Sequence, residues 1–232
     1  MKLFKLAASL ALALSAVPFV ASAQDAEESS AFSWSVDAVS DYVWRGVSQS
    51  DENPTLQAGF TYTGEIGLYA GVWGSGVDFG SGAPDVEVDY FVGFNKDLSD
   101  SVNFDIMVNR YTYPGASELN FNELLTTTTF ADTYSLSVNY SDDFGGADTD
   151  AWYVGLGASW GLPNDYSLDV SVGRSLFEKD YSDDYTDWSV GVGKSWGLFS
   201  AKLAYVGTDG TGRDLYGNLA DDRLVLSLSI GQ

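Results

Sequence analysis

Apolar and polar residues alternate with a period of two near the start of the chain. In residues 32–45 the even positions, such as Val36 and Trp44, are mostly apolar, while odd positions such as Asp37 are mostly polar. Alternation of this kind puts the two sorts of side chain on opposite faces of an extended strand. Residues 55–63 repeat the pattern, so the two runs predict an antiparallel hairpin.

Similar runs continue to the end of the chain and predict twelve strands in all. The predicted strands are residues 32–45, 55–63, 65–73, 85–94, 102–111, 120–130, 134–140, 152–160, 166–172, 188–196, 199–205 and 223–231. Residues 120–130 alternate least clearly, because two leucines and four consecutive threonines interrupt the pattern, and a β-bulge is compatible with them. Short connections alternate with long ones, as periplasmic turns and external loops do in outer-membrane barrels.

Aromatic residues bracket several of the apolar stripes. On the first run they stand near both ends of a tilted strand that would climb about 25 Å, the spacing of the aromatic girdles of a membrane barrel. The side chains predicted at the lipid interface are Trp34, Tyr42, Trp44, Trp152, Trp160, Trp188 and Trp196. Arg110 and Arg174 also occupy outward-facing positions, near strand ends. We expect them to reach lipid phosphates there.

A soluble β-sandwich would alternate too. It would explain neither the bracketing aromatic residues nor the alternation of short and long connections. The sequence therefore favours an all-β, antiparallel transmembrane β-barrel of about 12 strands.

The first hairpin carries a distinctive string. It reads Ser40-Asp41-Tyr42-Val43-Trp44-Arg45-Gly46-Val47-Ser48-Gln49-Ser50, followed by Pro54 and Leu56-Gln57-Ala58-Gly59-Phe60. This string resembles the opening hairpin of the TorF-type putative porin family of proteobacteria, and the strand layout extends the likeness over nearly the whole mature chain. The resemblance implies an outer-membrane barrel and a pore, and it implies no particular substrate.

The first 23 residues have the features of a secretory signal peptide. Lys2 and Lys5 precede an apolar stretch, and Ala21-Ser22-Ala23 forms a small-residue cleavage site. Residues 24–31 form an acidic lead-in, and residues 32–232 form the predicted barrel. No later apolar run is long enough for a transmembrane helix. We therefore expect cleavage after residue 23 and insertion into the outer membrane of a Gram-negative bacterium, with the barrel-assembly machinery, membrane lipid and lipopolysaccharide as partners.

Acidic residues outnumber basic ones by 33 to 11, which excludes nucleic acid as a partner. The charged residues predicted to line the lumen are Asp37, Asp41, Glu65, Asp85, Glu87, Asp89, Asp105, Asp169 and Asp187, against Arg45, Lys202 and Arg223. Such a lining attracts cations if the lumen is an open passage. The same acids would equally solvate or ion-pair within a plugged interior.

Arg45 is open to two interpretations. It forms an ion pair with Asp41 at the mouth of the pore, or it stabilises a turn by donating to loop carbonyls through its planar guanidinium group. Glycine at many inward positions is similarly ambiguous, because it leaves room for water or for larger neighbours such as Tyr69, Trp73 and Tyr153.

The chain has no His and no Cys, which removes the general base of Ser-His-Asp hydrolases and all thiolate chemistry. Glu87 and Asp89 share one open wall where nothing tunes them for acid–base catalysis. The acidic loops at residues 141–150 and 178–184 lack the ligand spacing of an EF-hand. We expect no catalytic residue, no metal site and no cofactor.

These observations predict a monomeric barrel for passive diffusion of small hydrophilic solutes, with a preference for cations. The alternative is a closed structural or surface-interaction barrel, since twelve strands do not by themselves guarantee a through-hole. The chain ends Ile230-Gly231-Gln232 rather than on the aromatic residue usual in such barrels, so we expect less efficient assembly.

Overall fold

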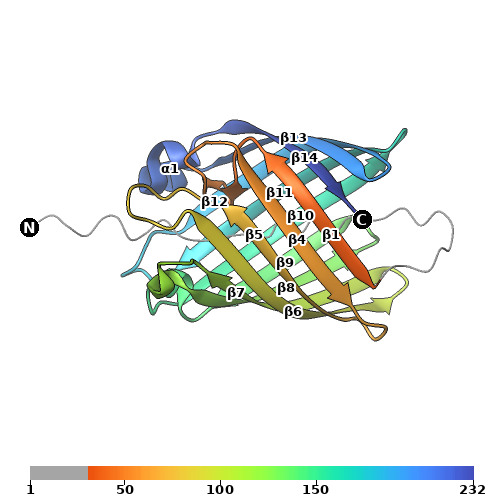
Figure 1. Cartoon of the computed structure of the whole chain (residues 1–232), viewed down its shortest axis with the longest axis horizontal. Helices are drawn as coiled ribbons and strands as arrows, with labels where there is room; N and C mark the ends of the chain where they lie inside the picture. Colours follow the sequence, from red (N-terminus) through yellow and green to blue (C-terminus); the bar gives the residue numbers. More distant parts are fainter. Residues whose placement is uncertain (1–30) are drawn as a thin grey trace, which may run out of the picture.

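The computed structural model describes residues 31–232, so the predicted signal peptide and most of the acidic lead-in lie outside the described residues. Twelve antiparallel strands close into a barrel, which confirms the predicted fold class (Figure 1). They are β1 (Phe32–Val39), β4 (Thr55–Thr63), β5 (Leu68–Gly76), β6 (Val86–Ser99), β7 (Val102–Thr112), β8 (Phe121–Phe130), β9 (Tyr134–Ser141), β10 (Ala151–Leu162), β11 (Tyr166–Phe177), β12 (Tyr185–Trp196), β13 (Phe199–Thr208) and β14 (Arg223–Gly231). Each pairs with its neighbour in sequence, and β1 closes the barrel by pairing with both β4 and β14.

The outer wall of the barrel is apolar. Leu203 pairs with Val192 on one side and with Leu226 on the other, so branched side chains stand next to one another across three strands. All three are exposed, with Leu203 at 50%. A continuous exposed apolar wall matches hydrocarbon and not water, as in membrane-spanning barrels.

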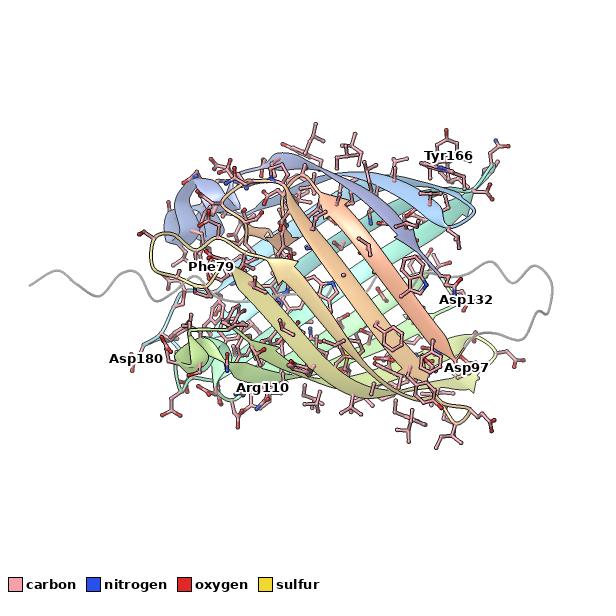
Figure 2. All side chains as sticks on the ribbon, in the orientation of Figure 1. Phe79, Asp97, Arg110, Asp132, Tyr166 and Asp180 are labelled. Carbon is pink, nitrogen blue, oxygen red and sulfur yellow. The ribbon has the colours of Figure 1, made fainter. Side chains whose placement is uncertain are left out.

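The two ends of the barrel differ in the length of their connections. One end, called the loop end, carries residues 40–54, 77–85, 113–120, 142–150, 178–184 and 209–222; the opposite turn end carries residues 64–67, 100–101, 131–133, 163–165 and 197–198. Figure 2 labels Asp97, Asp132 and Tyr166 at the turn end and Phe79 and Asp180 at the loop end. The predicted alternation of short and long connections is therefore confirmed.

Short helices occur at the loop end. They are η1 (Ser117–Leu119), η2 (Phe144–Gly146), α1 (Gly210–Tyr216) and η3 (Gly217–Ala220). Among the described residues, no helix is long and apolar enough to cross a bilayer.

The first strand is shorter than predicted. It ends at Val39, and residues 40–53, called the inward segment, fold into the barrel as a small hairpin of β2 (Val43–Trp44) and β3 (Val47–Ser48). Arg45 and Gly46 form its turn with φ of 44° and 79°, the left-handed conformation that two-residue hairpins require. Alternation continued past Val39 because a hairpin inside the lumen has the same period of two as a strand in the wall.

Strand β8, the least clear prediction, is regular and pairs with β7 and β9 without a change of register. The register shift in this part of the barrel lies between Asp97 and Ser99 at the end of β6. The blurred alternation of β8 thus arises from its composition, since its threonines occupy both faces of the strand.

Candidate functional site: a lumen with a closed and an accessible half

The inner face of the barrel changes character along its length. On β11 the inward residues are Asp169, which is partly accessible, then Ser171, which is exposed, and then Ser175, which is 1% exposed. Most other strands follow the same trend, with accessible inward side chains towards the turn end and buried ones towards the loop end; β4 and β12 depart from it. The lumen therefore has an accessible half and a closed half.

Local hydrogen bonds fix the inward segment in the closed half. The Gln49 amide donates to the Tyr42 carbonyl at 2.6 Å, and the Tyr42 amide donates to Ser50 Oγ at 3.0 Å. The hydroxyls of Ser48 and Ser50 both donate to Asp41 Oδ1, at 2.6 and 3.1 Å. The segment is thereby a defined fold of its own rather than a loose loop.

Gly46 is the point where the inward segment touches the barrel wall at β12 and β13. A Cβ atom there would lie 2.5 Å from Thr208 Cγ2 and 2.9 Å from the Gly207 carbonyl oxygen. Because the residue also has a positive φ, only glycine fits this position without strain. The tip of the segment therefore packs directly against β13, which is separated from β1 only by β14.

Aromatic side chains fill the space around the segment. Trp44 is 1% exposed and stacks on Phe144 of η2, with ring centroids 6.2 Å apart. Tyr111 and Phe121 on neighbouring strands stack at 4.4 Å beside them. These rings belong to the larger of two buried hydrophobic clusters in the described residues, and it lies at the loop end of the barrel.

Arg45 links the segment to the wall electrostatically. Its Nη2 donates to Glu123 Oε1 at 2.7 Å, and its guanidinium carbon lies 4.1 Å from the Trp44 ring centroid and 4.2 Å from that of Tyr153. Glu123 Oε2 accepts from the Tyr111 hydroxyl at 3.0 Å. Burial alone would lower the pKa of Arg45, but the adjacent Glu123 carboxylate raises it above its ordinary value. An arginine side chain stays protonated in proteins, so Arg45 carries a positive charge in this buried position.

Neither sequence interpretation of Arg45 is correct. Its partner is Glu123, 78 residues away, whereas Asp41 pairs with Arg223 at 2.7 Å. Sequence reasoning did not single out Glu123, because it lies on the strand with the weakest alternation. One signal was available in the sequence: Glu123 alternates with Phe121 and Leu125, so all three share one face of the strand.

Other predicted lumen charges also lie on the inner face, each beside a polar or charged side chain. In the closed half, Asp89 Oδ2 accepts from Asn109 Nδ2 at 3.0 Å, and Asp187 Oδ1 accepts from the Tyr153 hydroxyl at 3.2 Å. In the accessible half, Lys202 Nζ lies 3.1 Å from Asp169 Oδ2.

Of the remaining predicted charges, two accept hydrogen bonds from hydroxyl groups and two lie in connections between strands. Asp105 accepts from the Tyr69 hydroxyl at 2.8 Å, and Asp37 accepts from Ser35 Oγ at 3.0 Å. Glu65 and Asp85 are exposed in connections and do not lie on the inner face of a strand, because β5 and β6 begin later than predicted.

The predicted interface residues divide into two groups. Tyr42 and Trp44 are not at the lipid surface: they are 4% and 1% exposed inside the barrel, because the chain leaves the wall after Val39. The other five side chains occupy outward positions of their strands: Trp34, Trp152, Trp160, Trp188 and Trp196. 

The two outward arginines lie towards the loop end. Arg110 donates to Asn122 Oδ1 at 3.4 Å, and Arg174 donates to Thr186 Oγ1 at 2.9 Å (Figure 2 labels Arg110). Arg174 also lies 3.7 Å from Asp184 Oδ2.

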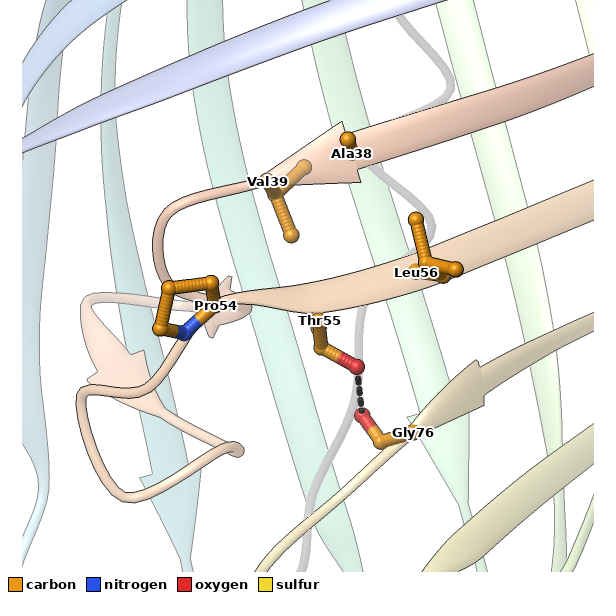
Figure 3. Close-up of a pocket in the computed structure, with 6 residues that line it drawn as sticks. All are labelled: Ala38, Val39, Pro54, Thr55, Leu56 and Gly76. Atoms are coloured by element: carbon orange, nitrogen blue, oxygen red, sulfur yellow. Dashed lines mark hydrogen bonds between the residues drawn. The ribbon is translucent and has the colours of Figure 1, made fainter.

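A hollow at the loop-end rim lies between β1, β4 and β5 (Figure 3). It is lined by Ala38, Val39, Pro54, Thr55, Leu56 and Gly76. No charged side chain lines it, and its one polar side chain, Thr55, donates to the Gly76 carbonyl. It offers a ligand no polar group to recognise, so the inner face remains the candidate site.

The glycines of the inner face provide space for aromatic rings. A Cβ atom on Gly173 would lie 1.9 Å from the Tyr153 hydroxyl oxygen, and one on Gly93 would lie 2.3 Å from Tyr69 Cζ. At these positions close packing, and not room for water, explains the glycine.

Two solved structures titled as porins have a similar fold. The structure titled "KdgM porin" has 6% sequence identity and a TM-score of 0.57, over 85% of this chain and 98% of that one. The structure titled "NanC porin structure in rhombohedral crystal form" has 10% identity and a TM-score of 0.56, over 87% of this chain and 98% of that one. At these identities the likeness concerns the fold alone. No curated protein matches this chain in sequence.

One protein family does match, over most of the chain. Residues 23–227 fit the family described as "Bacterial protein of unknown function (Gcw_chp)". The matched region includes the inward segment and every strand except the end of β14. The protein therefore belongs to this bacterial family.

Proposed function

We propose that the protein is a porin-like channel of the Gram-negative outer membrane, for passive diffusion of small hydrophilic solutes. The observation that carries the proposal is a closed barrel with an apolar outer wall and a charged, partly water-accessible inner face. The fold shared with the KdgM and NanC porins and the resemblance to TorF-type putative porins support it. Long loops would face the cell exterior and short turns the periplasm.

The closed half supports a gated channel rather than a permanently open one. A solute that enters from the turn end meets accessible polar residues up to mid-height, and then the inward segment and its aromatic neighbours. Passage therefore requires the inward segment to move, and the buried Arg45–Glu123 pair is one of the contacts that hold it in place.

A preference for cations follows from the charges of the accessible half. Asp37, Asp105 and Asp169 lie on its inner face, and Lys202 pairs with Asp169. An excess of acidic side chains along a narrow aqueous path raises the local cation concentration.

Conductance in planar bilayers tests the gated channel. We expect rare or small steps from the intact protein and frequent, cation-selective steps after residues 41–53 are replaced by Gly-Ser-Gly. The short linker is feasible because Val39 and Thr55 are already paired across β1 and β4. Deletion of Gly80, Ser81 and Gly82 from another loop serves as the control and should leave conductance unchanged.

The same experiment decides between the channel and a closed structural barrel. The packed core at the loop end is the observation that favours the closed barrel. If the shortened variant folds, as judged by heat-modifiable mobility in gels, and still does not conduct, the channel proposal is wrong.

We also propose that Arg110 and Arg174 contact lipid phosphates, such as those of lipopolysaccharide, on the outer wall. Their outward position near the loop end supports this, because a basic side chain costs little at the membrane interface. R110A/R174A should retain less lipopolysaccharide during purification than a variant with R213A in α1. Equal retention by the two variants would remove the proposal.

A further inference from the structure

A buried acidic pair lies on the wall beside the inward segment. Glu87 and Asp89 are two residues apart on the inner face of β6, and both are fully buried. Because residues separated by two share one face of a strand, the two carboxylates stand on the same face as neighbours. Among residues 31–232, Glu87 has no hydrogen-bond partner at either carboxylate oxygen, and Asp89 has none at Oδ1.

Three neutral oxygens surround this pair without partners of their own. Asn109, on the adjacent strand, donates through Nδ2 to Asp89 Oδ2, but its Oδ1 has no partner in the described chain. The hydroxyls of Tyr42, from the inward segment, and Tyr113, from the loop after β7, are likewise buried and unpartnered. The Tyr42 ring packs on Trp73, with centroids 5.5 Å apart, and Trp73 is the cross-strand partner of Asp89. Tyr113 belongs to the same buried cluster and follows Tyr111, the partner of Asp89 on β7.

The buried acidic side chains of the closed half outnumber the basic ones. The buried charged side chains of the described residues are Arg45 and five acids: Asp41, Glu87, Asp89, Glu123 and Asp187. Arg45 pairs with Glu123, and the half-buried Arg223 pairs with Asp41. No ion pair in residues 31–232 includes Glu87 or Asp89, and buried charge without a partner is costly.

We propose that Glu87, Asp89 and Asn109, covered by Tyr42 and Tyr113, bind a calcium ion through their oxygen atoms. Two carboxylates balance a divalent charge, and every available ligand is a hard oxygen, which suits Ca²⁺ or Mg²⁺ and disfavours Zn²⁺. Ca²⁺ accepts irregular coordination by six to eight oxygens, whereas Mg²⁺ usually keeps several of its waters, and a buried site has little room for them.

The ligand set also predicts the strength of binding. The described residues contain no group of three or more acidic side chains arranged to hold a metal ion, so this site rests on two carboxylates with neutral oxygens. We expect a dissociation constant of about 10⁻⁴ to 10⁻³ M, the range of extracellular calcium modules. The site does not depend on whether the channel opens, because its ligands are present in the closed form.

Terbium luminescence tests the site on the refolded full-length barrel in detergent micelles. Tb³⁺ occupies calcium sites and emits when a nearby tyrosine is excited, and Tyr42 and Tyr113 lie beside this pair. We expect one saturable site whose emission Ca²⁺ displaces and Mg²⁺ displaces at least tenfold less well. Absence of saturable, Ca²⁺-displaceable emission would overturn the proposal and mean that the pair holds a proton instead.

Two double variants distinguish Ca²⁺ binding at this site from Ca²⁺ binding by acidic side chains on the surface. E87Q/D89N should weaken Ca²⁺ competition by more than about a hundredfold, since even indirect partners of a metal ligand contribute about 10- to 100-fold. D142N/D143N, which removes two charges from a loop, should leave the competition unchanged. Equal Ca²⁺ binding by E87Q/D89N and the intact protein would contradict the proposal.

Two milder variants cover the case in which E87Q/D89N does not fold. Y42F and Y113F keep both carboxylates and remove one sensitising phenol each. Both should lower the tyrosine-excited emission per bound Tb³⁺, and Y134F, on the outer wall at the turn end, should not. Unchanged emission in Y42F and Y113F would overturn the proposal.

Discussion

The two halves of the lumen are built from the same twelve strands and the same alternation, yet one is closed and the other accessible. On β7 the inward residues change from Asn103 and Asp105 towards the turn end to Asn109 and Tyr111 towards the loop end, and exposure falls from partial to none. The inward segment then occupies what remains of the closed half. The size of the inward side chains and the path of one connection, and not the strand pattern, decide whether a barrel of this size is open.

The ion pairs of the two halves differ in the same way. The side chains of Arg45 and Glu123 are 4% and 1% exposed, whereas those of Lys202 and Asp169 are 32% and 15% exposed. Removing one partner of a buried pair leaves an uncompensated charge, while water can replace the partner in an accessible pair. The comparison therefore predicts unequal effects of two chemically similar substitutions.

The largest effect is expected for R45A. Loss of the guanidinium group leaves Glu123 charged and buried, which should lower the free energy of unfolding by about 3 to 5 kcal/mol. Denaturant-induced unfolding in lipid vesicles measures the change. R45M/E123L, which replaces both charges with apolar side chains of similar size, should recover most of the loss. If R45A is no less stable than R110A on the outer wall, the pair does not hold the inward segment.

The smallest effect on stability is expected for K202A. Its pair with Asp169 is partly solvated, so the free energy of unfolding should fall by no more than about 1 kcal/mol, and less at high salt. The reversal potential of the variant with residues 41–53 replaced should nevertheless shift towards greater cation selectivity, because Asp169 then faces the lumen alone. A loss of stability as large as that of R45A would show that the two halves are equally dry.

Sequence reasoning succeeded where a local pattern had one structural meaning. The apolar stripe of Leu224, Leu226 and Leu228 faces outward as expected, because residues of a strand separated by two share a face. It failed at Tyr42 and Trp44, where an amphipathic strand in the wall and an inward hairpin give the same alternation. It missed the Arg45–Glu123 pair because contacts between distant segments leave no local signal.

The sequence by itself determined the strands, their outward faces and the alternation of short and long connections, since backbone geometry and side-chain polarity are local properties. Only the tertiary structure decided that residues 40–53 fold inward, that Arg45 pairs with Glu123, and that Glu87 and Asp89 are shielded from water. Those outcomes depend on closure of the barrel, which brings β6, β8 and β13 around one interior and removes water from its loop end.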